Sequence, residues 1–254
     1  MEKVSINGIE LSYERRGKGT PLVLIHGYPL DHTIWNDVLP LLENDFDLIL
    51  PDVRGFGEST TVETPYTMTN IASDLAALLE TLGIKKTALA GHSMGGYVAL
   101  AFAKAFPDKT AGLALVSSQA AGDPPDRKEG RYKSAADVKQ NGVQPVADGM
   151  TDKLSSDQRV RDFVHPLIAK QSISAVVGAL SAMAEREDLT SFVAAFTHPL
   201  VLLHGDADNL IPVERAREIK SLVPSAALVE LPGAGHMPMM EQPEKTAKAL
   251  KMLI

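Results

Sequence analysis

The sequence predicts an α/β fold: a mostly parallel sheet of eight strands flanked by helices. Short apolar runs of strand length alternate with stretches whose apolar residues recur at helical spacing, which is typical of βαβ units. This alternation stops once, after the sixth strand. We therefore expect a core formed by residues 1–118 and 196–254, and an all-helical cap formed by residues 119–195.

The first two strands are expected within residues 4–15, where Asn7-Gly8 between alternating residues is a strong hairpin signal. Continuous apolar runs are typical of parallel strands that are covered on both faces. One such run lies at residues 22–25, and further strands are expected at residues 46–50, 87–90, 113–116, 199–203 and 227–231.

Helical spacing predicts helices around residues 35–42, 71–82, 98–105 and 216–222, with a terminal helix from Gln242-Pro243 onward. Residues 119–195 contain two apolar helical stripes, at 160–168, where Pro166 should produce a kink, and at 173–183. Residues 123–125 and 149–156 are interpreted as breaks. The simplest arrangement is a cap over the strand ends, and the alternative is a set of helices packed on a sheet face.

Composition narrows the function. The chain has 254 residues and a formal net charge of −7, which disfavours nucleic acid and anionic membrane surfaces as partners. It has no cysteine, which excludes disulfides, thiol catalysis and cysteine-bound metals. No secretory signal or membrane span is visible, so we expect a cytoplasmic protein that is a monomer or homodimer.

The segment Gly91-His92-Ser93-Met94-Gly95 lies between an expected strand and an expected helix. A serine held out on such a turn needs a strained backbone, and side chains at Gly91 and Gly95 would collide with the neighbouring strand and helix. This is the context of a nucleophile elbow. The alternative is a glycine-rich turn with an incidental serine.

A serine nucleophile needs a base, usually a histidine that a buried carboxylate orients. Of the seven histidines, His236 lies in a glycine-flanked loop after the last strand, and we predict it as the base. Asp206 and Asp208 compete for the role of the acid. We favour Asp208, which lies further out in its loop, and interpret Asp206 as a turn-forming carboxylate.

An oxyanion hole needs two backbone N–H groups aimed where negative charge develops. One is expected from Met94, directly after the serine and at a helix N-terminus. The other is expected from the loop after residues 22–25, with Tyr28 as the candidate. Neither donation depends on the identity of the side chain.

Together these segments resemble the α/β-hydrolase fold superfamily, and within it the small bacterial carboxylesterases and the 3-oxoadipate enol-lactonase-like group, which also contains cofactor-free perhydrolases. The resemblance implies Ser93 as nucleophile, Asp208 as acid and His236 as base, with Tyr28 and Met94 as oxyanion donors. It also implies a helical cap. The matching segments are His26-Gly27-Tyr28-Pro29 and residues 52–59, 91–96, 205–208 and 233–236.

Within this superfamily, Ser93 argues against dehalogenases and epoxide hydrolases, which use an aspartate at the elbow. Met237 after the histidine disfavours carbon–carbon bond hydrolases, which often carry tryptophan there. We therefore expect hydrolysis of a small-molecule carboxylic ester of short to medium acyl chain, without a cofactor or a metal. The alternatives are an enol-lactone hydrolase of the 3-oxoadipate type, a perhydrolase, and a non-catalytic ligand-binding member of the fold.

An apolar pocket is expected between the cap and the strand ends. Its predicted wall residues besides Tyr28 and Met94 are Leu30, Ile211, Met237 and Met239. An enol-lactone that carries carboxylates would need a cationic partner. The cap offers Arg127, Lys128, Arg131 and Lys133, although such a run is more typical of a solvated helix face. Arg54 is interpreted as structural.

Overall fold

A computed structural model describes residues 1–63 and 65–254. Eight strands form one sheet in the order β1-β2-β4-β3-β5-β6-β7-β8, in which β1, β2 and β4 pair antiparallel and all later neighbours pair parallel. This confirms the predicted fold class. The strands are β1 (Glu2–Ile6), β2 (Ile9–Gly17), β3 (Thr20–Ile25), β4 (Phe46–Pro51), β5 (Thr87–His92), β6 (Thr110–Val116), β7 (Leu200–Gly205) and β8 (Ala227–Leu231).

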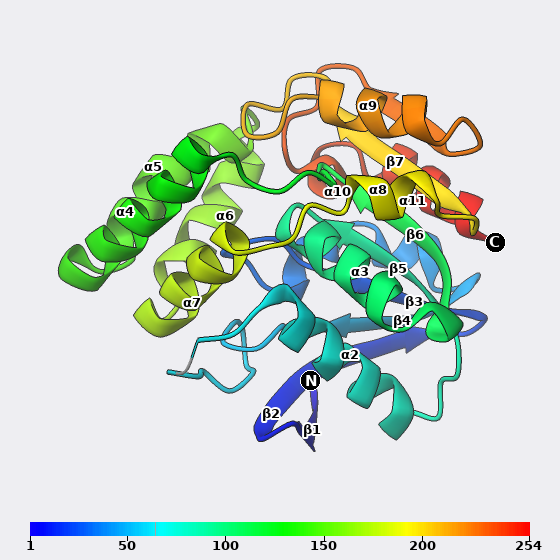
Figure 1. Cartoon of the computed structure of the whole chain (residues 1–254), viewed down its shortest axis with the longest axis horizontal. Helices are drawn as coiled ribbons and strands as arrows, with labels where there is room; N and C mark the ends of the chain where they lie inside the picture. The colour runs from blue at the N-terminus through cyan, green and yellow to red at the C-terminus, as the bar shows by residue number, and fades with distance from the viewer. Residues whose placement is uncertain (64) are drawn as a thin grey trace.

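The helices of the core follow the strands and cover the sheet. Figure 1 shows α2 and α3 side by side across one face of the sheet. The core helices are α1 (Leu39–Leu42), α2 (Met68–Thr81), α3 (Met94–Ala105), α9 (Glu214–Leu222), α10 (Pro238–Glu241) and α11 (Pro243–Leu250), with short 3-10 helices η1 (His32–Trp35), η2 (Pro107–Lys109) and η3 (Lys251–Leu253).

Five helices lie between β6 and β7, in the segment that we call the insertion (residues 119–195). They are α4 (Pro125–Asn141), α5 (Gln144–Leu154), α6 (Gln158–Ala169), α7 (Ile173–Ala184) and α8 (Thr190–Ala194). Figure 1 shows α4 to α7 grouped beside the core, where α4 packs on α7 and α5 on α6.

Some local expectations were wrong. The helix expected over residues 35–42 is split into η1 and α1, because a continuous helix would lose the hydrogen bond that the Pro40 nitrogen cannot donate. The break expected at residues 149–156 is largely helical, because Gly149 lies inside α5. The kink expected at Pro166 stays a prediction: this proline lies inside α6, which continues past it to Ala169.

The loop after β4 is fixed to the core by a buried ion pair. Arg54 donates two hydrogen bonds to Asp74 of α2, from Nε to Oδ2 at 2.6 Å and from Nη2 to Oδ1 at 2.7 Å. Both side chains are buried. Because removing either partner would leave an uncompensated buried charge, this pair supports the structural role expected for Arg54.

Among the described residues, no single helix has the length and apolar composition needed to cross a membrane. Helices α6 and α7 reach that length and composition only when taken together, and they meet at an angle of 104°.

Candidate active site

Ser93 lies on a strained turn at the carboxyl end of β5. Its φ of 52° falls in the left-handed region, which is costly for a residue with a side chain. The flanking glycines make the turn possible. A Cβ at Gly91 would lie 2.1 Å from the Gly95 carbonyl oxygen, and one at Gly95 would lie 2.3 Å from the Ile25 carbonyl oxygen. The serine is therefore held where β5 meets α3.

His236 and Asp208 come together from the loops after β8 and β7. The ring atom Nδ1 of His236 lies 2.7 Å from Oδ2 of Asp208, and both side chains are buried. Asp206 instead accepts a hydrogen bond from the Gly233 N–H at 2.7 Å, which joins the loop after β7 to the loop after β8. The structure thus brings Asp208, and not Asp206, to the histidine.

The Asp208 carboxylate is surrounded by donors. Its Oδ1 accepts the backbone N–H groups of Leu210 and Ile211 at 2.8 and 3.0 Å, and its Oδ2 lies 3.3 Å from Nε2 of His204. Burial by itself raises the pKa of Asp208. The charge that His236 carries when protonated, and the hydrogen bonds of both histidines, outweigh burial and lower this pKa far below its usual value. Asp208 is therefore an anion at neutral pH.

His92, the residue before the serine, supports the His236 loop. Its Nε2 donates to the carbonyl oxygen of His236 at 2.8 Å, and the two rings lie 4.8 Å apart. Burial lowers the pKa of His92 well below its ordinary value, so the ring stays neutral. The His236 N–H donates to the carbonyl oxygen of Leu154 in the insertion at 2.9 Å. Sequence reasoning missed both contacts, because neither follows a motif.

One pocket of about 680 Å³ is lined by both Ser93 and His236. Tyr28 and Ile211, expected on its wall, line it as well. Leu30, Met237 and Met239 were also expected there, but they are buried in the core and do not line this pocket. The side chain of Met94 is likewise buried, but the role expected of this residue is that of its backbone N–H group. The pocket takes its methionines from the insertion instead, as Met150 and Met183.

The insertion also gives the pocket a charged wall. Arg127, Arg131, Lys133 and Lys153 line it, together with one carboxylate, Asp137. Three of these cations were interpreted as a solvated helix face. The structure corrects that interpretation for Arg127 and Arg131, which are only partly exposed and line the pocket, whereas the Lys133 side chain is 75% exposed and pairs with Glu129 at 2.7 Å. Lys128 of the same helix does not line the pocket and instead pairs with Glu185 at 2.6 Å.

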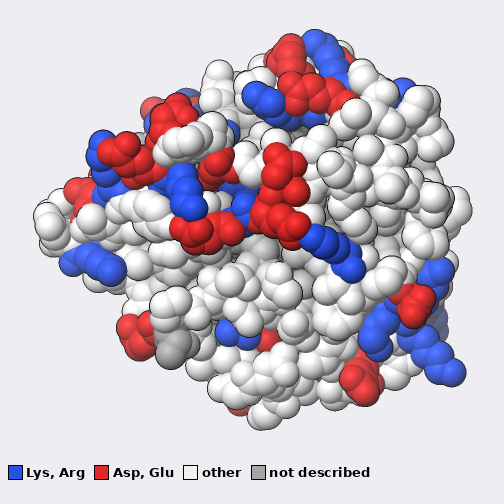
Figure 2. Space-filling model, viewed as in Figure 1, with Lys and Arg blue, Asp and Glu red and all other residues white. Residues whose placement is uncertain are grey.

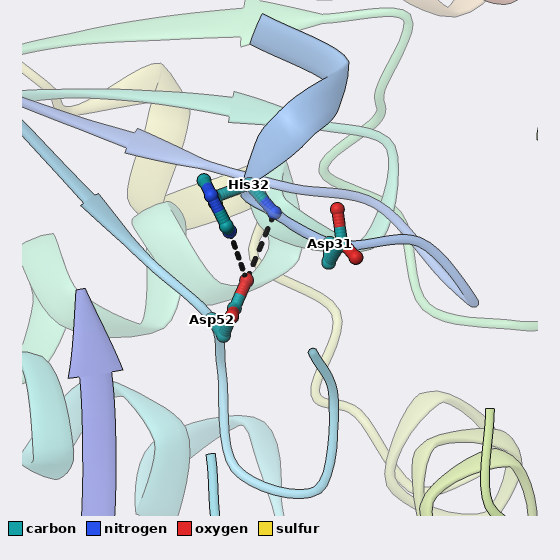
Figure 3. Close-up of side chains that lie close together, drawn as sticks. All are labelled: Asp31, His32 and Asp52. Carbon is teal, nitrogen blue, oxygen red and sulfur yellow. Dashed lines mark hydrogen bonds and ion pairs between the residues drawn. The ribbon is translucent and has the colours of Figure 1, made fainter. Parts of the chain in front are cut away.

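A second cluster of ionisable groups lies away from this pocket. Figure 3 shows Asp52 joined to the ring and backbone N–H of His32, at 2.7 and 3.0 Å, with Asp31 to one side. Three such residues could hold a metal ion. Here, however, Asp52 also accepts the Glu58 N–H at 2.9 Å, and Asp31 pairs with Lys170 at 3.0 Å. Protein donors already serve both carboxylates, so we assign the cluster a structural role.

Comparisons with known proteins show the family to which the fold belongs. The family model for the alpha/beta hydrolase fold matches residues 20–243. A thermophilic esterase from Thermogutta terrifontis is 37% identical with a TM-score of 0.94, and the match covers 99% of this chain and 97% of the esterase. An enol-lactonase from Burkholderia xenovorans LB400 has a TM-score of 0.91, with 99% of each chain covered, but at 22% identity it shows the fold alone.

Among curated proteins, the dihydrolipoyllysine-residue acetyltransferase component of the acetoin cleaving system of Pseudomonas putida is 31% identical over 96% of this chain. The chain spans 66% of the length of that relative. The similarity to the Thermogutta terrifontis esterase supports assignment as a hydrolase. From its family-model match and its fold, the chain belongs to the α/β-hydrolase fold family.

Proposed function

We propose that this protein is a serine hydrolase that cleaves carboxylic esters of short to medium acyl chain through an acyl-enzyme. Ser93 is the nucleophile, His236 the general base and Asp208 the acid that orients it. One observation carries the proposal: Ser93 and His236 line the same pocket, and Nδ1 of His236 lies 2.7 Å from a buried carboxylate of Asp208. The insertion, which supplies one wall of that pocket, is the proposed cap.

The reaction follows from the roles of these groups. Because Nδ1–H of His236 donates a hydrogen bond to Asp208, Nε2 carries no proton and can take the proton of the Ser93 hydroxyl as its oxygen attacks the ester carbonyl. The protonated imidazole then donates that proton to the leaving alcohol. In the second half, the imidazole activates a water molecule, which hydrolyses the acyl-serine and restores the enzyme.

The proposed oxyanion hole consists of the backbone N–H groups of Tyr28 and Met94. Within the described parts of the chain, neither N–H donates a hydrogen bond to a protein acceptor. Met94 is also the first residue of α3, where the helix dipole favours negative charge. Two unpaired donors beside the serine are what a tetrahedral oxyanion needs.

Labelling with a fluorophosphonate tests the proposed nucleophile. We expect one site of modification at Ser93, located by peptide mass spectrometry, and loss of labelling in His236→Ala because the hydroxyl then has no base. Labelling of another serine, or undiminished labelling of the His236→Ala variant, would contradict the proposed mechanism.

A specific observation favours carboxylate-bearing esters or lactones as a second candidate class of substrate. The wall of the pocket carries four cations and one carboxylate in a chain of net charge −7. Figure 2 shows charged side chains of both signs over the insertion. Behind the wall, Asp123 pairs with Arg131 and also with Arg127 and Arg186, so one carboxylate is shared among three guanidinium groups.

An excess of positive charge beside a catalytic serine would attract an anionic substrate and stabilise it when bound. The solved Thermogutta terrifontis esterase has malate bound. Malate is a dicarboxylate, so this neighbour also favours an anionic ligand. In this chain, the carboxylate of an anionic ester or lactone would lie toward α4 and α5, and its carbonyl carbon at Ser93.

Removing two of the wall cations should lower the preference for anionic esters. For the double variant Lys133→Gln/Lys153→Gln, we expect kcat/KM for a hemisuccinate ester to fall about threefold to tenfold relative to the butyrate ester of the same alcohol, since each exposed charge contributes up to about 1 kcal/mol. The ratio should also fall as salt is added. Lys128→Gln, on the same helix but outside the pocket, is the matched control. Equal ratios in all three proteins would contradict an anionic preference.

A further inference from the structure

A second pocket of about 370 Å³ adjoins the first, and Tyr97 lines both. Tyr97 lies in the first turn of α3, four residues after Ser93, and lines the same pocket as the proposed nucleophile. It is 4% exposed. The Tyr97 side chain is therefore a shared wall between the pocket of Ser93 and the second pocket.

Arg186 holds this wall in place. Its guanidinium carbon lies 4.2 Å from the centroid of the Tyr97 ring, within the range of a cation–π contact. Nη1 of Arg186 lies 2.7 Å from the buried Asp123 carboxylate, and Nη2 donates to the Ala121 carbonyl oxygen at 2.9 Å. With its fork bound on two sides, the guanidinium fixes the position of the ring that it covers.

The second pocket suits an alkyl chain. Its lining includes the apolar side chains of Met68, Leu100, Ala101 and Leu189. Four charged residues also line it. Lys104 and Glu187 pair with one another and remain about half exposed, so they form its outer rim together with the exposed Glu185, whereas the Arg186 side chain is buried. The space behind Tyr97 thus has an apolar side and a charged outer rim, with the buried guanidinium of Arg186 against the Tyr97 ring.

We propose that Tyr97, clamped by Arg186, sets the longest alkyl chain that the site accepts, and that the second pocket takes the end of a longer chain once the ring is removed. This inference rests on the proposed ester hydrolase function. It concerns chain length only, and the Tyr97 ring takes no part in bond making or breaking.

The test is a chain-length series on wild type, Tyr97→Ala and Tyr97→Leu, the last being less disruptive of folding. Acyl chains from C2 to C12 are varied as p-nitrophenyl esters, and alcohol chains are varied as alkyl acetates. We expect wild-type kcat/KM to fall beyond medium length. Both variants should instead gain about fourfold per added methylene in one of the two series until the second pocket is filled, as burial of a CH₂ group predicts.

Two further variants make the result specific. Tyr97→Phe keeps the ring and should keep the wild-type length limit, whatever its overall rate. Ala101→Leu, added to Tyr97→Ala, fills the second pocket and should remove the gain on long chains. Ala101→Leu alone should leave the wild-type limit unchanged, because the second pocket is then still closed off.

The inference is overturned if folded Tyr97→Ala or Tyr97→Leu hydrolyses short esters and keeps the wild-type length profile in both series. Failure of the proposed function gives a different result: wild type would hydrolyse neither series, or Ser93→Ala would be as active as wild type. That outcome would contradict the proposed hydrolase function and, with it, the inference about chain length.

Discussion

The variant Ser93→Ala is expected to hydrolyse p-nitrophenyl acetate with a kcat lowered by a factor on the order of 10⁶, which is the scale of loss when a serine nucleophile is removed. The residual rate would come from binding and from the N–H groups of Tyr28 and Met94, which alanine leaves in place. Stability should change little, because Ser93 and alanine share the same strained φ of 52° and the side chain differs by one oxygen. Steady-state kinetics and thermal unfolding measure the two quantities.

Ser117 provides a matched control. Like Ser93, it directly follows a parallel strand and has a positive φ, 47°. Its buried Oγ has no hydrogen-bond partner among the described residues. Ser117→Ala should therefore be neutral or slightly stabilising and retain wild-type activity within a few-fold. If Ser93→Ala is as active as Ser117→Ala and wild type, Ser93 is not the nucleophile. If none of the three hydrolyses the ester above the uncatalysed rate, the protein belongs instead with the non-catalytic binding members of the fold.

The sequence was sufficient to predict the elements of the core because its local apolar runs and turn residues agree with the way the strands and helices pack. The parallel strands are mostly apolar, although β4 contains Asp47 and β8 contains Glu230. Polar or glycine-rich loops follow them, so the positions of strands and loops are both marked in the sequence. The turn at Ser93 was predictable for the same reason. Only glycine fits at positions 91 and 95, where any Cβ would lie within 2.4 Å of a backbone oxygen.

The insertion was harder to predict because its helices carry weaker patterns. Helix α4 has only Ala135 and Val138 buried, so no apolar stripe marks it or shows which side faces inward. Its charged residues therefore resembled a solvated surface. Their position at the pocket depends on how α4 packs on α7, which is a long-range contact without a local signal.

Some of the residues predicted to line the pocket do not line it, for a related reason. Met237 and Met239 are close in sequence to His236, and neighbours of a catalytic residue are natural candidates for its pocket. Both side chains are instead fully buried, because residues 238–241 form a short helix that is packed into the core. Proximity along the chain gives no information about the direction of a side chain after a turn.

Replacing Asp208 with asparagine should lower kcat by about 10⁴-fold, since the geometry survives but the histidine takes the wrong tautomer. The asparagine oxygen would be retained by the N–H groups of Leu210 and Ile211, which leaves its NH₂ group facing Nδ1 of His236. Nδ1 must then accept, so Nε2 carries the proton and cannot take one from Ser93. Asp206→Asn is the matched control in the same loop, and it should stay within a few-fold of wild type.

The same variant should change how stability depends on pH. Asp208 has a lowered pKa in the folded state, so the unfolded chain binds its proton first as the pH falls. The stabilisation is complete above the unfolded pKa of about 4 and is lost progressively below it. Wild type should therefore lose stability faster than Asp208→Asn between about pH 5 and pH 3, as measured by denaturant unfolding. Parallel pH dependences would show that Asp208 is not held as a buried anion, and without that anion nothing would keep Nε2 of His236 free to accept the serine proton.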